Sequence, residues 1–429
     1  METRELREAE DTAERPQALA GVKVVVIGGV ATAPTMARYF ALHGATVVRV
    51  DSHVHLDTIR WQRPFFPHLV GNPDGGVWYA TLNSSALGIA VDWTKPMGLH
   101  IMRRLVRWAD VVIENFLPGA LAKRGLDYST IARGCPEVIY LSSCLMGQDG
   151  PWAGMVGYGQ QATAIAGVHE LCGFPDDAPT PIETMYTDFV SPRFGVTAIL
   201  AALEHRRRTG RGQYLDQSQV ESGIHFIAPL VMDWTSNGRV ATRTGSRNPA
   251  AAPHGVYRCA GDDRWLAIGV FTDEQWRRLC RVEGIPEALK GERFGTLLGR
   301  KRHEDELDAL LGGWTRQRTA EQVEAWLQAQ GVPAAIVADS RDTRRDPQLN
   351  ARGFFRRFNH KVIGEHTYRG PAFRLSRTPD RQFAGPALGE HSVAVCKMIG
   401  MSEEEIAGAL SEGALATGPS DQQARQVIT

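Results

Sequence analysis

The sequence has no excess of charge of either sign, because its 48 lysines and arginines equal its 48 aspartates and glutamates. Proteins whose main partner is nucleic acid or an anionic membrane surface carry a surplus of basic residues. We therefore expect neither nucleic acid nor a membrane as a partner. The balance still allows a few local basic side chains to hold a small anion.

Long apolar runs are also missing, since no stretch approaches the roughly 18 to 20 apolar residues that a membrane-spanning helix needs. The segment from Met1 to Pro16 is rich in Glu and Arg and contains no apolar core of a secretory signal. Six cysteines are scattered without a CxxC pair or a zinc-ligand spacing. This usage is typical of reduced thiols, so we expect a cytoplasmic protein without a metal site.

An alternation of short β-branched runs and helical patterns fills the first third of the sequence. The strand patterns cover residues 22–27, 46–50, 111–113 and 138–142, and the helical patterns cover residues 34–43, 96–108 and 121–133. Strands that alternate with helices predict a parallel sheet with helices on both faces. We therefore expect an α/β fold with a Rossmann-like, doubly wound sheet.

Ligands of such sheets bind beyond the carboxyl ends of the strands. Glycine or polar residues stand at these ends here, at Gly28-Gly29, Asp51, Glu114-Asn115 and Ser142-Ser143. The first loop lacks the GxGxxG pattern of dinucleotide-binding proteins, and Pro34 occupies the place of its third glycine. We therefore expect no NAD-type cofactor, although the start of the following helix is suited to part of a phosphorylated ligand.

The pattern changes after a capping-box helix start at Ser218 to Glu221. Shorter mixed elements follow, which predict a second, smaller α+β domain. The expected division is a loose N-terminal segment at 1–18, the first part of the large domain at 19–224, the small domain at 225–340, a return leg to the large domain at 341–412 and a disordered tail at 413–429.

Asp188 stands at the entrance of a predicted helix that ends near Thr209-Gly-Arg-Gly-Gln213. Unpaired backbone N–H groups at a helix start favour an ionised carboxylate, and an ionised carboxylate can act as a nucleophile. An aspartate at such a place is more commonly a helix N-cap. The local pattern alone leaves both interpretations open.

Several segments in their order along the chain resemble the family III CoA-transferases, the group that includes formyl-CoA and carnitine CoA-transferases. No single segment is specific, but the ordered series is, and it covers roughly residues 19 to 400. The matching segments are residues 19–24, Gly44 to Asp51, Glu114 to Gly119, Gly147 to Pro151, Asp188, Thr209 to Gln213, Asp216, Glu221, Asn248-Pro249 and Pro253 to Tyr257.

The resemblance implies a large domain built from both ends of the chain and two interlocked subunits, as a homodimer or as a heterodimer with a related chain. It places the catalytic aspartate at Asp188. Five residues later, Arg193 either pairs with a second carboxylate of a dicarboxylic substrate or only covers the helix surface, and Tyr158 is a further expected substrate-binding residue. Coenzyme A would be part of the substrate, with no permanently bound cofactor. The implied CoA site comprises Ala31, Thr32, Asn83, Asn115, Phe116, Lys123, Met146 and Gly147.

The implied reaction moves CoA from an acyl-CoA donor to a small carboxylic acid through an aspartyl anhydride and thioester. The segment from Tyr186 to Phe194 looks like the succinyl-CoA:benzylsuccinate type, which suits a succinyl donor and an aromatic or dicarboxylic acceptor. Basic residues that often hold the nucleotide end of CoA in the family are missing, for example at Ser52 and Cys144. We therefore expect the nucleotide end on other basic residues, namely Arg49, Arg60, Lys95 or Arg104.

Two other functions remain open at this point. The fold also serves CoA-ester racemases and isomerases, but Tyr158 replaces the proton-shuttling histidine that those enzymes have there, which leaves His169 and His254 as bases. The chain could also be the non-catalytic subunit of a heteromeric transferase. The missing basic contacts favour that role, and the presence of Asp188 argues against it.

Overall fold

The computed structural model describes residues 16–419, so residues 1–15 and 420–429 of the predicted terminal segments lie outside the described residues. Contacts divide the chain into two compact units. Of the described residues, the first unit comprises 16–168, 182–232 and 350–419, and the second comprises 169–181 and 233–349. The first unit therefore contains parts of both ends of the chain.

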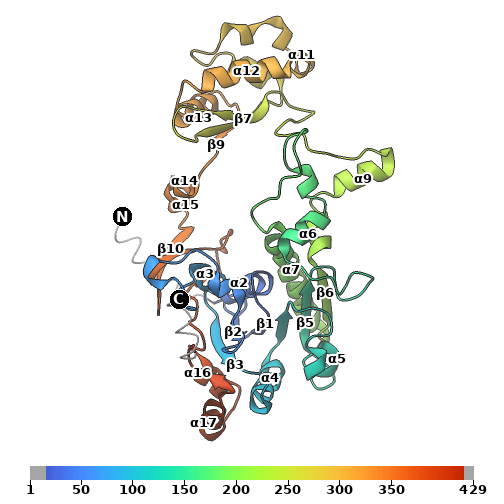
Figure 1. The fold of residues 1–429 in the computed structure, drawn as a ribbon, viewed down its shortest axis with the longest axis vertical. Coiled ribbons are helices and arrows are strands. Elements are labelled where there is room, and N and C mark those ends of the chain that lie inside the picture. The colour runs from blue at the N-terminus through green and yellow to red at the C-terminus, as the bar shows by residue number, and fades with distance from the viewer. Residues whose placement is uncertain (1–15, 420–429) are drawn as a thin grey trace. The chain divides into compact units, whose positions relative to one another are not determined.

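A seven-stranded sheet forms the centre of the first unit, in the order β12-β3-β2-β1-β4-β5-β6 (Figure 1). All neighbouring strands are parallel except β12 and β3. The strands are β1 (Lys23–Ile27), β2 (Thr46–Asp51), β3 (Leu87–Val91), β4 (Val111–Glu114), β5 (Ile139–Cys144), β6 (Tyr214–Ser218) and β12 (Leu415–Ala416). This arrangement confirms the predicted α/β fold with a mostly parallel sheet.

Helices pack on both faces of this sheet because alternate strand residues point to opposite sides. Val25 and Val48 pack in one apolar cluster with α4, α16 and α17, whereas Val24 and Val47 pack in another with α2 and α7. The helices of the unit are α2 (Thr32–Leu42), α3 (Val77–Leu82), α4 (Pro96–Trp108), α5 (Tyr128–Ile131), α6 (Gly159–Ile165), α7 (Tyr186–Thr209), α8 (Gln219–Ile224), α16 (Ser392–Met398) and α17 (Glu403–Ser411). The unit also contains an antiparallel hairpin of β10 (Phe355–His360) and β11 (Gly364–Arg369).

The structure differs from the sequence-based expectation in two segments. The helix expected at 121–133 is broken into a short 3₁₀ turn and α5, because Gly125 adopts a left-handed φ of 67° that ends the first turn. Within the segment expected to be a disordered tail, Leu415 and Ala416 form β12. Leu415 is buried against the sheet, and this apolar contact holds the segment in place.

The second unit contains an antiparallel sheet of β7 (His254–Arg258), β8 (Trp265–Gly269) and β9 (Ala334–Ile336), in that order. Its helices include α10 (Asp273–Leu279), α11 (Leu297–Arg302), α12 (Glu304–Thr315), α13 (Ala320–Ala329) and α14 (Ser340–Arg345), while α9 (Ala228–Asn237) and α15 (Pro347–Ala351) cross the unit boundaries. A separate apolar core joins the sheet to α10, α12 and α13. Within residues 16–419, no helix has the length and apolar character to cross a lipid bilayer.

Candidate active site

Four helices begin around the carboxylate of Asp188. Asp188 is the third residue of α7, while Thr32, Gly159 and Gln219 are the first residues of α2, α6 and α8. The hydroxyl of Thr32 donates to Asp188 Oδ1 at 3.1 Å, and the Gly159 N–H and the Gln219 side chain donate as well. The N–H groups of a first helical turn have no partner within the helix, so Gly159 is free to make this bond. The carboxylate therefore has donors from three different helices.

The position of Asp188 separates the two interpretations left open by the sequence. The N-cap of α7 is Met185, so Asp188 does not cap its helix. Its side chain is instead buried, with 4% of the residue exposed. Burial raises its pKa to about 6, although the bonds from Thr32, Gln219 and Gly159 act in the opposite direction. The group is still mostly ionised at pH 7.

A cavity of about 500 Å³ lies beyond the carboxyl ends of β1, β2 and β4. The chain reverses its path across the sheet between β1 and β4, which is where ligands bind in sheets of this type. Of the expected site residues, the cavity brings together Asn115, Phe116 and Tyr158. Asp188 does not line it, but the residues next to its partners do, namely Tyr158 beside Gly159 and Val30 near Thr32.

Asn115 shapes this cavity through the loop after β1. Its Oδ1 accepts from the Gly29 N–H at 2.9 Å, and its Nδ2 donates to the Gly29 carbonyl at 3.0 Å. A Cβ on Gly28 would lie 2.0 Å from Asn115 Oδ1, so only glycine permits this approach. Phe116 beside it packs against Trp93, with ring centroids 5.9 Å apart. The cavity therefore has one fixed polar wall and one aromatic wall.

The other expected CoA residues lie elsewhere. Ala31 and Thr32 are buried at the start of α2, where Thr32 contacts Asp188 instead of the cavity. Asn83 is buried at the end of α3 and donates to the Tyr79 carbonyl at 2.9 Å. Lys123 is exposed on a 3₁₀ turn, and Met146 and Gly147 lie in the turn after β5, outside the cavity lining.

Arg193 lies apart from both Asp188 and the cavity described above. It lines a separate, mainly apolar cavity of about 400 Å³ together with Tyr39, His43 and Phe373. The two side chains leave α7 on different sides, because five residues correspond to about 140° of rotation in an α-helix. The expected contact of Arg193 with a substrate beside Asp188 is therefore not formed in the chain as described.

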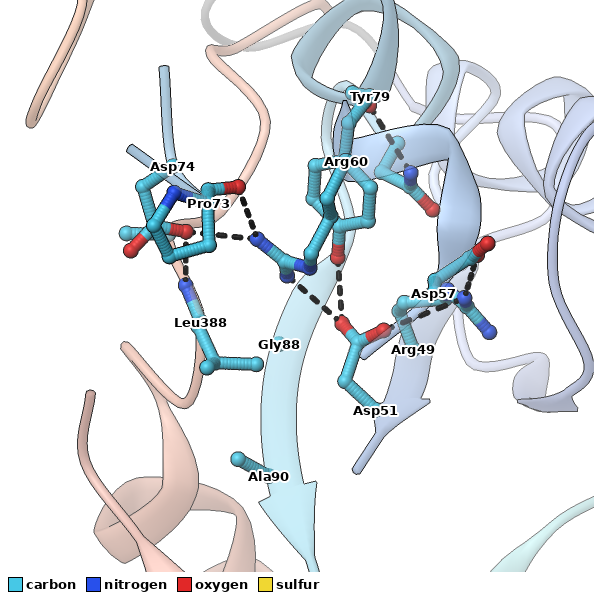
Figure 2. A network of polar contacts seen from close by, with 12 residues as sticks. Arg49, Asp51, Asp57, Arg60, Pro73, Asp74, Tyr79, Gly88, Ala90 and Leu388 are labelled. Carbon is cyan, nitrogen blue, oxygen red and sulfur yellow. Dashed lines mark hydrogen bonds and ion pairs between the residues drawn. The ribbon is translucent and has the colours of Figure 1, made fainter. Parts of the chain in front are cut away.

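The four basic residues expected to hold the nucleotide end of CoA are engaged within the protein. Arg49 and Arg60 are buried in a network of ion pairs with aspartates (Figure 2). Lys95 donates to the Glu412 and Gly413 carbonyls, and Arg104 donates to the Gly400 carbonyl and pairs with Glu405. Arg60 is fully buried between Asp51 and Asp74. Arg49 pairs with Asp51 and Asp57 but also lines the cavity of about 500 Å³, so a contact of Arg49 with CoA stays a prediction.

Two residues at the Asp188 carboxylate, Gly159 and Gln219, were not among the expected site residues. Gly159 carried a signal, since glycine stood where the related racemases have an aspartate. Gln219 carried none, because its bond to Asp188 joins two different helices and its bond to Thr32, at 2.9 Å, joins residues 187 positions apart. The expected racemase bases His169 and His254 both belong to the second unit, whereas Asp188 belongs to the first.

Comparison with known proteins gives a consistent result. The sequence matches the family description "CoA-transferase family III" over residues 19–392. A succinyl-CoA–D-citramalate CoA-transferase from Chloroflexus aurantiacus is 30% identical over 91% of this chain and 96% of its own length. A succinate–glutarate CoA-transferase from Agrobacterium fabrum is 32% identical over 90% of this chain and 96% of its own length.

A solved structure is similar throughout as well. The crystal structure of a CAIB/BAIF family protein from Brucella suis superposes with a TM-score of 0.82, at 30% identity, over 90% of this chain and 100% of that chain. The family match over residues 19–392 spans strands β1 to β6, the position of Asp188 and the whole second unit. The chain belongs to CoA-transferase family III, and it is an enzyme that transfers CoA from an acyl-CoA to a free carboxylic acid.

Proposed function

We propose that Asp188 is the nucleophile that carries CoA between the two acids. The observation that supports this role is the convergence of three donors, from Thr32, Gly159 and Gln219, on one buried carboxylate. A carboxylate with a pKa of about 6 is mostly ionised at pH 7 and needs no general base to attack a thioester. The N–H of Gly159 is also placed to stabilise an oxyanion that develops on the aspartyl carbonyl.

The proposed reaction has four balanced steps. Asp188 attacks the thioester carbonyl of the donor, which gives an aspartyl–acyl anhydride and CoA thiolate. The thiolate then attacks the aspartyl carbonyl, so an aspartyl–CoA thioester forms and the donor acid leaves. The acceptor carboxylate displaces CoA from this thioester and forms a second anhydride. Finally, the thiolate attacks the acceptor carbonyl, which releases the new acyl-CoA and regenerates Asp188.

The cavity beyond β1, β2 and β4 is the proposed site for part of CoA. Asn115 and Phe116 provide the polar and aromatic walls, and Tyr158 forms its edge with 62% of the residue exposed. Because Asp188 is covered in the chain as described, the Tyr158 side chain has to move aside for the thioester to reach it, while the Gly159 N–H stays on the carboxylate. The exposure of Tyr158 is compatible with such a movement.

We infer that the donor is succinyl-CoA and that the acceptor is a dicarboxylic acid. The support is the names of the two relatives, which act on succinyl groups together with citramalate or glutarate. The proposed kinship with the succinyl-CoA:benzylsuccinate branch remains a sequence-based prediction. We also propose that two subunits interlock, as a homodimer or with a related chain, and that Arg193 contacts substrate only in that assembly.

The proposal is tested by trapping the CoA adduct. After incubation with succinyl-CoA and acid quenching, we expect intact-mass spectrometry to show the chain with one added CoA less one water. Peptide mapping after borohydride reduction should place the modification on Asp188. In parallel, labelled succinate should exchange into succinyl-CoA, because the first two steps are reversible.

Other outcomes separate the alternatives. An adduct on a different residue, or exchange without any adduct, would contradict the role of Asp188. Turnover of a lone acyl-CoA without exchange of labelled succinate would instead identify an isomerase. Exchange that appears only after a related chain is added would identify a non-catalytic subunit.

Replacing Gly159 with alanine is expected to displace Asp188. A Cβ on residue 159 would lie 2.4 Å from Asp188 Oδ2 and 2.6 Å from Cγ, closer than packed atoms approach. The carboxylate must then move, and a displacement of about 1 Å at a reacting group can lower the rate about 100-fold. The kcat of labelled-succinate exchange measures this loss. Gly154→Ala is the matched control, since nothing lies within 4 Å of a Cβ built there; equal kcat values for the two variants would contradict the expectation.

A further inference from the structure

The loop between β1 and α2 contains a valine in an unfavourable backbone conformation. Val30 has a φ of 58°, in the left-handed region that β-branched residues rarely adopt. Ala31 follows it directly, and Thr32 then donates the hydrogen bond to Asp188. The position of the Thr32 hydroxyl therefore depends on a backbone turn that the sequence itself disfavours.

Asp57 provides the contacts that hold this turn. The N–H of Val30 donates to both carboxylate oxygens of Asp57, at 3.1 Å and 3.0 Å, and the N–H of Ile59 donates to Oδ1 at 3.1 Å. The preceding residue, Gly29, is held by Asn115, which accepts from the Gly29 N–H and donates to the Gly29 carbonyl. The two residues before Ala31 are thus fixed by side chains from two other segments.

The Asp57 carboxylate is itself held from the opposite side. Arg49 Nη2 donates to its Oδ2 at 2.7 Å, and the same Nη2 lies 3.2 Å from Asp51 Oδ1 (Figure 2). Asp51 in turn pairs with Arg60, which pairs with Asp74, and all these side chains are at least nine-tenths buried. Asp57 is therefore the end of a row of alternating buried charges, and this row fixes the distance from β2 to Val30.

We propose that Asp57 is a positioning residue that holds Val30 in its left-handed conformation and so places the Thr32 hydroxyl on Asp188. This inference rests on the proposed function of Asp188 as the nucleophile. Asp57 would not contact the reacting atoms, and it would act only through the loop from Val30 to Thr32. An asparagine at this position has one acceptor oxygen, so its NH₂ group would face either the Val30 N–H or Arg49, which are both donors.

The test combines Asp57→Asn with Val30→Gly. Asp57→Asn is expected to lower the kcat of labelled-succinate exchange on the order of 10- to 100-fold, with the KM for succinyl-CoA changed by less than about threefold. Glycine adopts a positive φ freely, so the Val30→Gly single variant is the reference against which the double variant is compared. The double variant should recover most of the lost kcat, because its turn no longer needs the contacts of Asp57.

The pH dependence of kcat gives an independent readout. Because the bond from Thr32 lowers the pKa of Asp188, the acid limb should move to higher pH in Asp57→Asn and return in the double variant. Thr32→Val should shift the acid limb to higher pH by a similar amount. The Thr32→Val, Asp57→Asn double variant should show no further shift, because both substitutions act through the same hydrogen bond. Asp57→Glu, which keeps a charge for Arg49 but moves the oxygens by one methylene group, should lose kcat similarly and replaces Asp57→Asn if that variant does not fold.

Three outcomes would overturn the inference. The first is a change in KM alone for Asp57→Asn, which would mark Asp57 as a direct substrate contact in the cavity. The second is no recovery on adding Val30→Gly, and the third is an unmoved acid limb. Failure of the proposed function would be recognised separately, because Asp188→Asn would then keep its labelled-succinate exchange activity.

Discussion

The Asp188→Asn enzyme is expected to lose CoA transfer by at least about 10⁴-fold, because removal of a nucleophile leaves only the binding contributions to the rate. An amide nitrogen or oxygen cannot form the anhydride and return CoA from a thioester. Labelled-succinate exchange and the CoA adduct should both disappear. Asp149→Asn, at an exposed position after β5, is the matched control and should keep full activity.

The same variant is expected to remain folded. The Gln219 Oε1 is buried and has no hydrogen-bond partner, so it can accept from an asparagine NH₂ group at position 188. The Thr32 hydroxyl can rotate to accept, and the amide oxygen can still accept from the Gly159 N–H. Loss of activity through unfolding is therefore not expected, and far-ultraviolet circular dichroism should match the wild type.

The pH dependence of stability should separate the two proteins. The pKa of Asp188 is raised from 3.8 to about 6 on folding, so the folded state binds this proton more tightly than the unfolded state. Its ionisation therefore destabilises the wild type progressively as pH rises from about 4 to 6, by up to about 3 kcal/mol. Asp188→Asn lacks this destabilisation because its side chain does not ionise. Its stability relative to wild type, from urea titrations, should be about 1 kcal/mol greater at pH 7 than at pH 5, and an equal difference at both values would contradict the raised pKa.

The activity profile follows from the same pKa. Only the ionised carboxylate attacks a thioester, so kcat should fall below about pH 6, the pKa that burial produces at Asp188. A profile that stays flat down to pH 5 would mean that the group is ionised well below that value in the complex. The stability difference would still be expected, because it depends on the pKa in the ligand-free protein.

Local sequence patterns predicted the parts of the fold that depend on local interactions. The β-branched runs marked β1, β2, β4 and β5, because strands buried on both faces need apolar residues throughout. The helix expected at 121–133 was wrong because Gly125 interrupts it. The edge strand at Leu415 was missed because its stability comes from a contact with β3, more than 300 residues earlier.

The site was predictable to the extent that it follows motif order. Motif order predicted Asp188, Asn115 and Phe116, and the last two line one cavity. The sequence did not predict that Gly159 and Gln219 donate to Asp188, or that Arg49 and Arg60 pair with aspartates inside the protein. Whether an arginine meets a ligand or an internal aspartate depends on the folded path of the chain, which residue type and spacing do not reveal.

Arg60→Met is expected to destabilise the first unit by about 3–5 kcal/mol, a large fraction of the total stability of a typical domain. The Arg60 side chain is fully buried and pairs with Asp51 at 3.0 Å and Asp74 at 2.6 Å. Its guanidinium also lies 3.6 Å from the centre of the Tyr79 ring. Methionine fills a similar space but leaves the buried Asp74 carboxylate without its cation and leaves Asp51 with Arg49 alone, and this loss dominates the energy.

The effect of Arg60→Met should extend to the return leg of the chain. Asp74 Oδ1, which accepts from Arg60, also accepts from the Leu388 N–H at 2.7 Å, as Figure 2 shows. Release of Asp74 should therefore increase hydrogen exchange at Leu388 before the unit unfolds globally. Arg208→Met is the matched control, because Arg208 pairs with Glu204 on the surface and such pairs contribute about 1 kcal/mol or less. Urea titrations that show equal losses for the two variants would mean that the buried charges are hydrated or compensated, and the row from Asp74 to Asp57 would then not act as a fixed support for Val30.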